Sequence, residues 1–330
     1  MLMIGVDVAS DTLAVGEARG GKTKPFPNDN PGVAELCAWL ESREPQGQVQ
    51  VILEPTSTYH HLVIQSLSRL GISYTCVNPS RTKAFAHALG QRAKTDAVDA
   101  QMLALYGESQ QPDPSPSPDE AQQGLKALRR HKESLEREAE ATQNRLEAAR
   151  RSPWTPRAVL ESLERKLRWC QEEVERVTKE LREVVIQDER WSHGMDLLTS
   201  IPAISEKTAV VLLSELPPVE RCATGKQWVA FCGVNPEPHD SGNTTWSRLS
   251  KKGAARIRVR LYMPAVNALR WNPPIRALGE RLKAKGKGGK LRVMASMNKL
   301  LRQAFAVLST GQSFDPSLVR VPALDNQDSI

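Results

Sequence analysis

The 330-residue sequence has no apolar run near the roughly 20 residues that a membrane-spanning helix needs. Its first residues, Met1 to Asp7, include no basic leader and no small-residue cleavage site, so we expect no signal peptide. The five cysteines are odd in number, widely spaced and without a CxxC pair, which argues against a disulfide framework and a zinc site. These absences predict a cytoplasmic protein with no membrane partner.

Acidic residues are scarce in one part of the chain. From Arg248 to Arg302 there are 16 Lys and Arg and one acid, Glu280, so this segment carries +15 while the rest of the chain sums to −8. Such a concentration predicts a polyanionic partner, with nucleic acid ahead of a membrane surface. A solvated basic surface is the alternative. The GxxxxGK[ST] loop is also absent, so ATP use is not indicated.

The first hundred residues alternate between short apolar runs and longer amphipathic segments. We expect strands over 3–8, 12–18, 22–26, 48–53 and 73–77, and helices over 32–41, 59–70, 80–89 and 94–108. Three antiparallel strands followed by alternating helices and strands predict a mixed α/β sheet.

Four acids stand where this sheet would bring them together. Asp96 and Asp99 are three residues apart at the start of a predicted helix and share one face of it. Asp7 and Glu54 lie at the ends of predicted strands. Acids in a first turn are also favoured by the helix dipole alone. Four converging carboxylates need cations, however, and hard oxygen ligands suit Mg²⁺ or Mn²⁺. Two such ions could clamp a phosphodiester, which is nuclease or strand-transfer chemistry.

The chain resembles the insertion-sequence transposases of the "one-ten" family. The resemblance rests on Gly5-Val6-Asp7, on Leu53-Glu54-Pro55-Thr56 with Tyr59, on Val77-Asn78-Pro79 and on Lys94-Thr95-Asp96-Ala97-Val98-Asp99-Ala100. It implies a RuvC-like domain of the ribonuclease H fold, in which Asp7, Glu54, Asp96 and Asp99 bind two Mg²⁺ ions. Asp11 is the rival for the first position, but it falls in a turn. Family members usually carry glycine where this chain has Ser57.

The middle of the chain predicts a linker and two long helices. Residues 110–118, with alternate prolines, predict a stiff extended linker. Apolar heptads then run over 125–149 and, after Pro153 and Pro156, over 160–184. We expect a helical hairpin that also meets a second protomer; a hairpin within one chain and with no partner is the alternative. The segment 197–216 resembles a helix-hairpin-helix element, with Ala203 and Ser205 where glycines are usual; contact with the DNA backbone and simple core packing are both open.

Ser241 is the predicted nucleophile. Taken naively, the segment 236–243 is a polar turn. In the family, a catalytic serine precedes a glycine between Phe-x-Gly-x-x-Pro and Lys-x-Gly stretches, and 231–236 and 251–253 flank Ser241 in that way. Ser247 and Ser250 are the alternatives. A serine hydroxyl needs activation, and the metal site is a more economical activator than His239 two residues away.

The C-terminal part predicts mainly helices with basic side chains for nucleic acid. Helices are expected over 225–231, 254–269 and 275–285, with a last helix ending near 308. The expected phosphate contacts are Lys251, Lys252, Arg256, Arg258, Arg260, Lys287 and Lys290. The predicted parts are a catalytic domain (1–109), a linker (110–119), a helical hairpin (120–188), a transposase domain (189–316) and a tail (317–330).

The sequence therefore predicts a DNA transposase or recombinase, bacterial and nucleoid-associated. The resemblance implies a covalent phosphoserine intermediate, double-stranded DNA of the element ends and target, a non-coding bridge RNA as guide, and a dimer or tetramer. Two alternatives remain. One is a metal-dependent junction nuclease in which water attacks, and the other is a non-catalytic nucleic-acid-binding protein.

Overall fold

The computed structural model divides the chain into two compact units, Met1–Asp119 and Glu120–Ile330. It describes residues 1–18, 23–43, 48–91, 95–241, 244–250 and 253–318, and no side chain is described from 238 to 249. None of the described helices is both long and apolar enough to cross a membrane.

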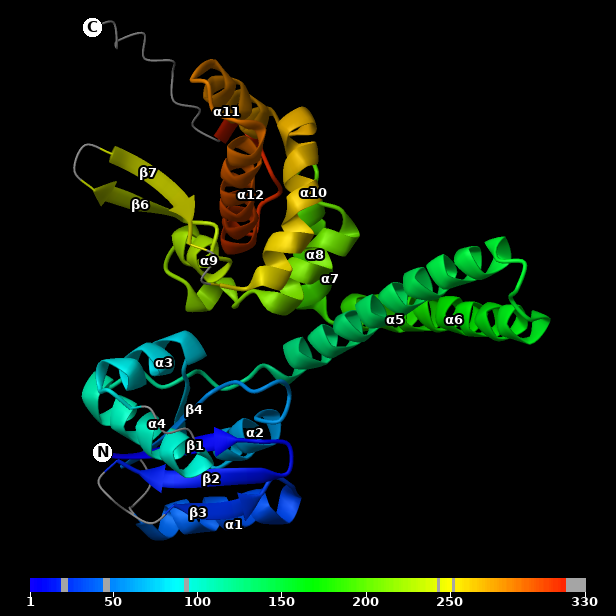
Figure 1. Cartoon of the computed structure of the whole chain (residues 1–330). Helices are drawn as coiled ribbons and strands as arrows, with labels where there is room; N and C mark the ends of the chain where they lie inside the picture. The colour runs from blue at the N-terminus through cyan, green and yellow to red at the C-terminus, as the bar shows by residue number, and fades with distance from the viewer. Residues whose placement is uncertain (19–22, 44–47, 92–94, 242–243, 251–252, 319–330) are drawn as a thin grey trace, which may run out of the picture. The chain divides into compact units, whose positions relative to one another are not determined.

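The first unit is built on one mixed sheet of five strands (Figure 1). The strands are β1 (Leu2–Val8), β2 (Thr12–Glu17), β3 (Lys24–Pro27), β4 (Val49–Leu53) and β5 (Ser73–Cys76). Their order is β3-β2-β1-β4-β5; β1 to β3 pair antiparallel, while β4 and β5 run parallel to β1. All five residues of β4 are buried, as expected of a central parallel strand covered on both faces.

Helices cover both faces of this sheet. They are α1 (Asn30–Arg43), α2 (His61–Arg69), α3 (Pro79–Ala88) and α4 (Asp96–Gln110). On one face, Leu36 of α1 and Leu67 of α2 pack with Ile4 and Val51 in the larger core. On the other face, Leu103 and Tyr106 of α4 join Met3, Ile52 and Val77. This arrangement confirms the predicted ribonuclease H-like fold of the N-terminal region.

The proline-rich segment after α4 is bound along β5, at the edge of the sheet. The Gln50 side chain donates to Pro112 O (2.8 Å), and the Thr75 hydroxyl donates to Asp113 O (2.9 Å). Ser115 N donates to Tyr74 O (2.7 Å), and the Ser115 hydroxyl accepts from Cys76 N (3.0 Å). This stretch is extended, as alternate prolines predict, and it is part of the first compact unit.

The second unit begins with a long helical hairpin, α5 (Glu120–Arg151) and α6 (Arg157–Gln187), which confirms the two heptad helices and the proline turn. The two seams face each other: Leu135 and Leu146 of α5 and Cys170 and Val177 of α6 are buried. The heptads are therefore at least partly satisfied within one chain.

The rest of the second unit is mainly helical. Its elements are α7 (Glu189–Thr199), α8 (Glu206–Glu215), η1 (Val219–Arg221), α9 (Gly225–Phe231), β6 (Pro236–Ser241), β7 (Thr244–Leu249), α10 (Ala255–Trp271), α11 (Pro273–Ala284), α12 (Gly289–Thr310) and η2 (Pro316–Leu318). One core, which includes Leu198, Trp228, Leu261 and Leu301, joins the helices to the start of the hairpin through Leu125. Ala203, at a position where glycine was expected, has φ +82°.

Candidate active site

Asp7 and Glu54 stand side by side at the carboxyl ends of neighbouring parallel strands. Val6 of β1 is paired with Leu53 of β4. Asp7 and Glu54 directly follow these two paired residues and are therefore neighbours. Both acids are half-buried, whereas the residues before them are fully buried. The carboxyl ends of parallel strands are where open α/β sheets place their functional side chains.

A hydroxyl from α3 holds the carboxylate of Glu54. The Thr82 Oγ1 is buried and donates a hydrogen bond to Glu54 Oε1. α3 begins at Pro79, and the side chain of Asn78 caps it by accepting from Ser80 N (2.9 Å). No sequence motif pointed to Thr82; its position one helical turn after the Asn-Pro cap was the available signal.

Asp96 and Asp99 occupy the first turn of α4, as predicted. Thr95 caps the helix, because its hydroxyl accepts from Val98 N (3.3 Å). α4 packs on β1 and β2, and Gly5 allows this close approach: a Cβ built on Gly5 would lie 1.9 Å from Ala100 O. The glycine before Asp7 therefore sets how closely the helix carrying the other two acids lies on the strand.

Burial and the charges of the other three acids all change the pKa of Asp7. The pKa of Asp7 is raised from 3.8 to about 6, first by burial and then by the negative charges of Asp99, Asp96 and Glu54. Asp11 is exposed in the turn after β1 and is not among these causes. Asp7 is thus within electrostatic reach of the three other carboxylates that the sequence singled out.

The donor set fits a hard divalent cation, since it consists of carboxylate oxygens in a region of negative potential. Among the described residues, no three His, Cys, Asp or Glu side chains are gathered closely enough to hold a metal ion as they stand. Repulsion by the charges of Asp99, Asp96 and Glu54 adds to the effect of burial on the pKa of Asp7, and a bound cation would relieve that repulsion.

We expect the burial of Asp7 and the repulsion by its neighbouring acids to appear as a pH dependence of stability. Between about pH 4 and pH 6 the folded protein binds more protons at Asp7 than the unfolded chain does, so the free energy of unfolding falls as pH rises through this interval. In EDTA, Asp7→Asn should therefore raise the melting temperature at pH 7 and change it little near pH 4. Magnesium at pH 7 should stabilise the wild type more than the variant; equal pH profiles for the two proteins would contradict this prediction.

Asn28 fastens the two loops that carry the strand-end acids. Its side-chain amide donates to Ala9 O, after β1 (2.8 Å), and to Tyr59 O, in the loop after β4 (3.1 Å). In that second loop Ser57, where glycine is usual in the family, adopts φ +51°. The left-handed conformation that favours glycine is thus retained with serine. Sequence reasoning missed Asn28, because only its tertiary contacts show its role.

Ser241 lies in the second unit, at the end of β6. The expected polar turn over 236–243 is wrong in part: Pro236–Ser241 forms a strand that pairs antiparallel with β7, and Ser241 is opposite Thr244 next to the connection. Of the alternatives, Ser247 is paired with Pro238 within the ribbon, and Ser250 N donates to Asn235 O (3.0 Å). Lys251 and Lys252 lie outside the described residues.

The three arginines expected to bind phosphates at the start of α10 have different surroundings. Arg256 is exposed. Arg258 donates to Cys232 O (2.8 Å) and Gly253 O (3.1 Å), which joins the start of α10 to the end of α9. Arg260 lies 3.1 Å from the carboxylate of Glu133.

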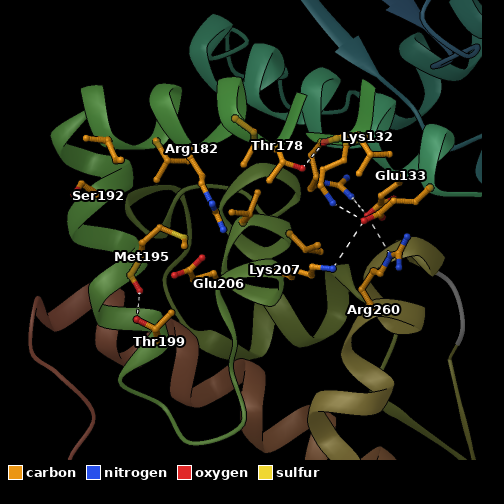
Figure 2. Close-up of a pocket in the computed structure, with 18 of the residues that line it drawn as sticks. Lys132, Glu133, Thr178, Arg182, Ser192, Met195, Thr199, Glu206, Lys207 and Arg260 are labelled. Carbon is orange, nitrogen blue, oxygen red and sulfur yellow. Dashed lines mark hydrogen bonds and ion pairs between the residues drawn. The ribbon is translucent and has the colours of Figure 1, made fainter. Parts of the chain in front are cut away.

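Arg260 and Glu133 line a cavity of about 610 Å³ between the helical hairpin and α7, α8 and α10 (Figure 2). Lys207 points toward the same wall, 3.9 Å from Glu136. Basic and acidic side chains line the cavity together with apolar ones that include Leu181 and Val211. The cavity belongs to the second unit and contains none of the four clustered carboxylates.

A ribonuclease H-like sheet with an acidic cluster at its strand ends defines an enzyme that acts on nucleic-acid phosphodiesters. Residues 4–150 match a DEDD transposase family described as "Transposase", and residues 195–280 match the "Transposase IS116/IS110/IS902 family". The chain belongs to this family of transposases, enzymes that act on DNA phosphodiesters and use divalent metal ions.

Two relatives resemble the chain over nearly its whole length. A "Pilin gene-inverting protein" of Moraxella bovis is 27% identical over 322 residues, which cover 94% of this chain and 97% of the relative. A protein of the same name from Moraxella lacunata is 26% identical over 322 residues, with the same coverage.

Proposed function

We propose that this transposase cleaves and rejoins DNA through Ser241, with two Mg²⁺ ions held by Asp7, Glu54, Asp96 and Asp99. The observation that carries the proposal is the placement of the four acids: Asp7 and Glu54 follow paired residues of two parallel strands, and Asp96 and Asp99 lie in the first turn of the helix packed on β1, where their charges act on Asp7. Such a cluster is suited to divalent ions, which supply charge stabilisation at a phosphodiester and favour ionisation of an attacking hydroxyl.

The serine step is a transesterification. Ser241 Oγ forms a bond to phosphorus, the phosphorus–oxygen bond to the sugar breaks, and the serine proton ends on the leaving hydroxyl. In the reverse step, the hydroxyl of another strand attacks the phosphoserine and releases Ser241. Because each step exchanges one phosphate ester for another, strands are rejoined without ATP. Ser241 lies at the end of the β6–β7 ribbon, opposite Thr244. This position supports its proposed role as the nucleophile, because the end of a two-stranded ribbon can reach a DNA backbone.

The relatives support rejoining over simple hydrolysis. Each is named for inverting a pilin gene, and an inverted segment must be joined again at both ends. We infer the same type of reaction here, directed by a non-coding guide RNA and carried out by a dimer or tetramer in the bacterial nucleoid. The basic segment 248–302 supports RNA as well as DNA as a partner. Ser241 and the four carboxylates belong to different units. In the proposed reaction, the serine that attacks the phosphodiester therefore comes either from the protomer that holds the metal ions or from another protomer.

The test is a search for a covalent adduct. Protein purified with co-expressed RNA is incubated with Mg²⁺ and end-labelled DNA that spans both ends of the element encoding it. We expect a denaturant-stable protein–DNA adduct in the wild type, none in Ser241→Ala, and none in EDTA. Ser247→Ala and Ser250→Ala are the matched controls and should retain the adduct.

The other outcomes decide between the alternatives. Cleavage that survives Ser241→Ala and leaves no adduct would identify a junction nuclease in which water attacks. Loss of the adduct in Ser247→Ala or Ser250→Ala alone would move the nucleophile. Tight binding that is independent of Mg²⁺, with no cleavage of any substrate, would indicate a non-catalytic nucleic-acid-binding protein.

A further inference from the structure

Basic side chains are used differently in two parts of the second unit. In the helical hairpin several of them pair with acids, as Arg150 does with Glu164 (2.7 Å) and Arg176 with Glu173 (2.6 Å). In α11, α12 and the loop between them, eight cations form no ion pair with a described carboxylate. This α11–α12 basic patch consists of Arg281, Lys283, Lys285, Lys287, Lys290, Arg292, Lys299 and Arg302.

The nearest acid in sequence is already engaged. Glu280 is the single acid between 273 and 310, and it lies 3.9 Å from Arg276. A solvated basic surface usually mixes both signs of charge, whereas this patch carries one sign. Its uncompensated charge therefore calls for an external anion.

Lys299 lies within electrostatic reach of two other cations of the patch, Arg281 and Arg302. It is half-buried, and its spacing from Arg292 and Arg302 places all three on one face of α12. Burial and then the positive charges of Arg281 and Arg302 lower the pKa of Lys299. The Nε of Arg292 is buried without a hydrogen-bond partner among the described atoms. Several cations thus share a partly desolvated surface, where an anion would be bound more strongly than at an exposed lysine.

We propose that α11 and α12 bind the phosphodiester backbone of a duplex nucleic acid, with Arg281, Lys299 and Arg302 as the principal contacts. α11 and α12 pack against each other (Figure 1), so both helices present cations from a rigid support. Long cationic side chains contact phosphates without reading bases, so binding here is independent of sequence. The proposal deepens the proposed function and relies on it for nucleic acid as the ligand; Lys287 and Lys290 extend the same surface.

The test is the salt dependence of binding by the full-length protein. The probes are a 25-base-pair DNA duplex of arbitrary sequence and an RNA duplex of the same sequence, each titrated over a series of KCl concentrations. We compare the wild type with the triple variant Arg281→Gln, Lys299→Gln, Arg302→Gln. Each phosphate contact contributes about 0.9 to the slope of log K against log[salt], so the triple variant should lose about 2 to 3 from the slope.

A second triple variant controls for the change in net charge of the protein. Arg165, Lys166 and Arg168 are exposed on α6, and changing them to Gln removes the same net charge. The proposal requires the slope to fall only in the α11–α12 variant, with circular dichroism unchanged; the more affected duplex identifies the bound nucleic acid. Equal slopes in all three proteins, or equal losses in both triple variants, would overturn it. The adduct formed by Ser241 is a separate readout, so either proposal can fail without the other.

Discussion

Replacing Gly5 by alanine is expected to destabilise the N-terminal unit by about 3 kcal/mol or more, at the upper end of what overpacking does. The added Cβ would lie 1.9 Å from Ala100 O and 2.6 Å from Ala104 N. Both atoms belong to the backbone of α4, so no side chain can rotate away and the helix itself must move off β1. Because α4 carries Asp96 and Asp99, the same shift should also weaken stabilisation by Mg²⁺.

The measurement is urea denaturation of the full-length protein, with and without Mg²⁺. Gly124→Ala is the matched control: a Cβ added to Gly124 on α5 would meet nothing within 4 Å, so this variant should gain about 0.5–1 kcal/mol from helix propensity. The prediction is contradicted if Gly5→Ala has the same urea midpoint as the wild type and is stabilised equally by Mg²⁺. The close packing of α4 on β1 would then not determine the positions of Asp96 and Asp99.

Glu215→Gln should destabilise the second unit by about 3 kcal/mol, because the buried guanidinium of Arg129 keeps only Glu133 as a counter-charge while Arg130 and Lys126 lose theirs. Glu215, at the end of α8, accepts hydrogen bonds from Arg129 and Arg130 of α5, and Lys126 lies 3.5 Å away. The side chains of Arg129 and Glu215 are 5% and 6% exposed. Burial alone would raise the pKa of Glu215, but the hydrogen bond from Arg130 and the three positive charges outweigh it and hold the pKa below its usual value.

Thermal and urea denaturation of Glu215→Gln measure this effect. The control is Glu180→Gln, since Glu180 lies 4.0 Å from Arg176 at an exposed position of α6, where an ion pair contributes about 0.5 kcal/mol or less. A Glu215→Gln variant as stable as Glu180→Gln would show that the contact between α5 and α8 depends on apolar packing alone.

Local sequence signals were sufficient for the sheet and for the four clustered acids. Alternating apolar residues predicted β1 to β5, and the helix expected from residue 94 begins two residues later, at Asp96. These features depend on neighbours in sequence. Thr82 and Asn28 escaped notice because their partners, Glu54 and Tyr59, are about thirty residues away, and a lone hydroxyl or amide carries no local pattern.

The ribbon at Ser241 shows the opposite case, in which a local signal was misleading. Pro236, Pro238 and Gly242 favour a turn, yet 236–241 is a strand. The two prolines are two residues apart, so their missing N–H groups fall on one edge of β6, and a two-stranded ribbon leaves such an edge free. The turn propensity of each single residue does not show that two prolines, two positions apart, can share the unpaired edge of a strand.

The segment 112–116 along β5 also affects how the sheet behaves toward other molecules. β5 ends the sheet on one side, and an open edge strand offers its backbone groups to any strand of a neighbouring molecule. Here Cys76 N and Tyr74 O are already bonded to Ser115, and the covering segment contains Pro112, Pro114 and Pro116, which have no N–H to extend the ladder. The segment 112–116 thus protects β5 from edge-to-edge aggregation. Replacing its prolines would supply N–H groups that could pair with a strand of another molecule.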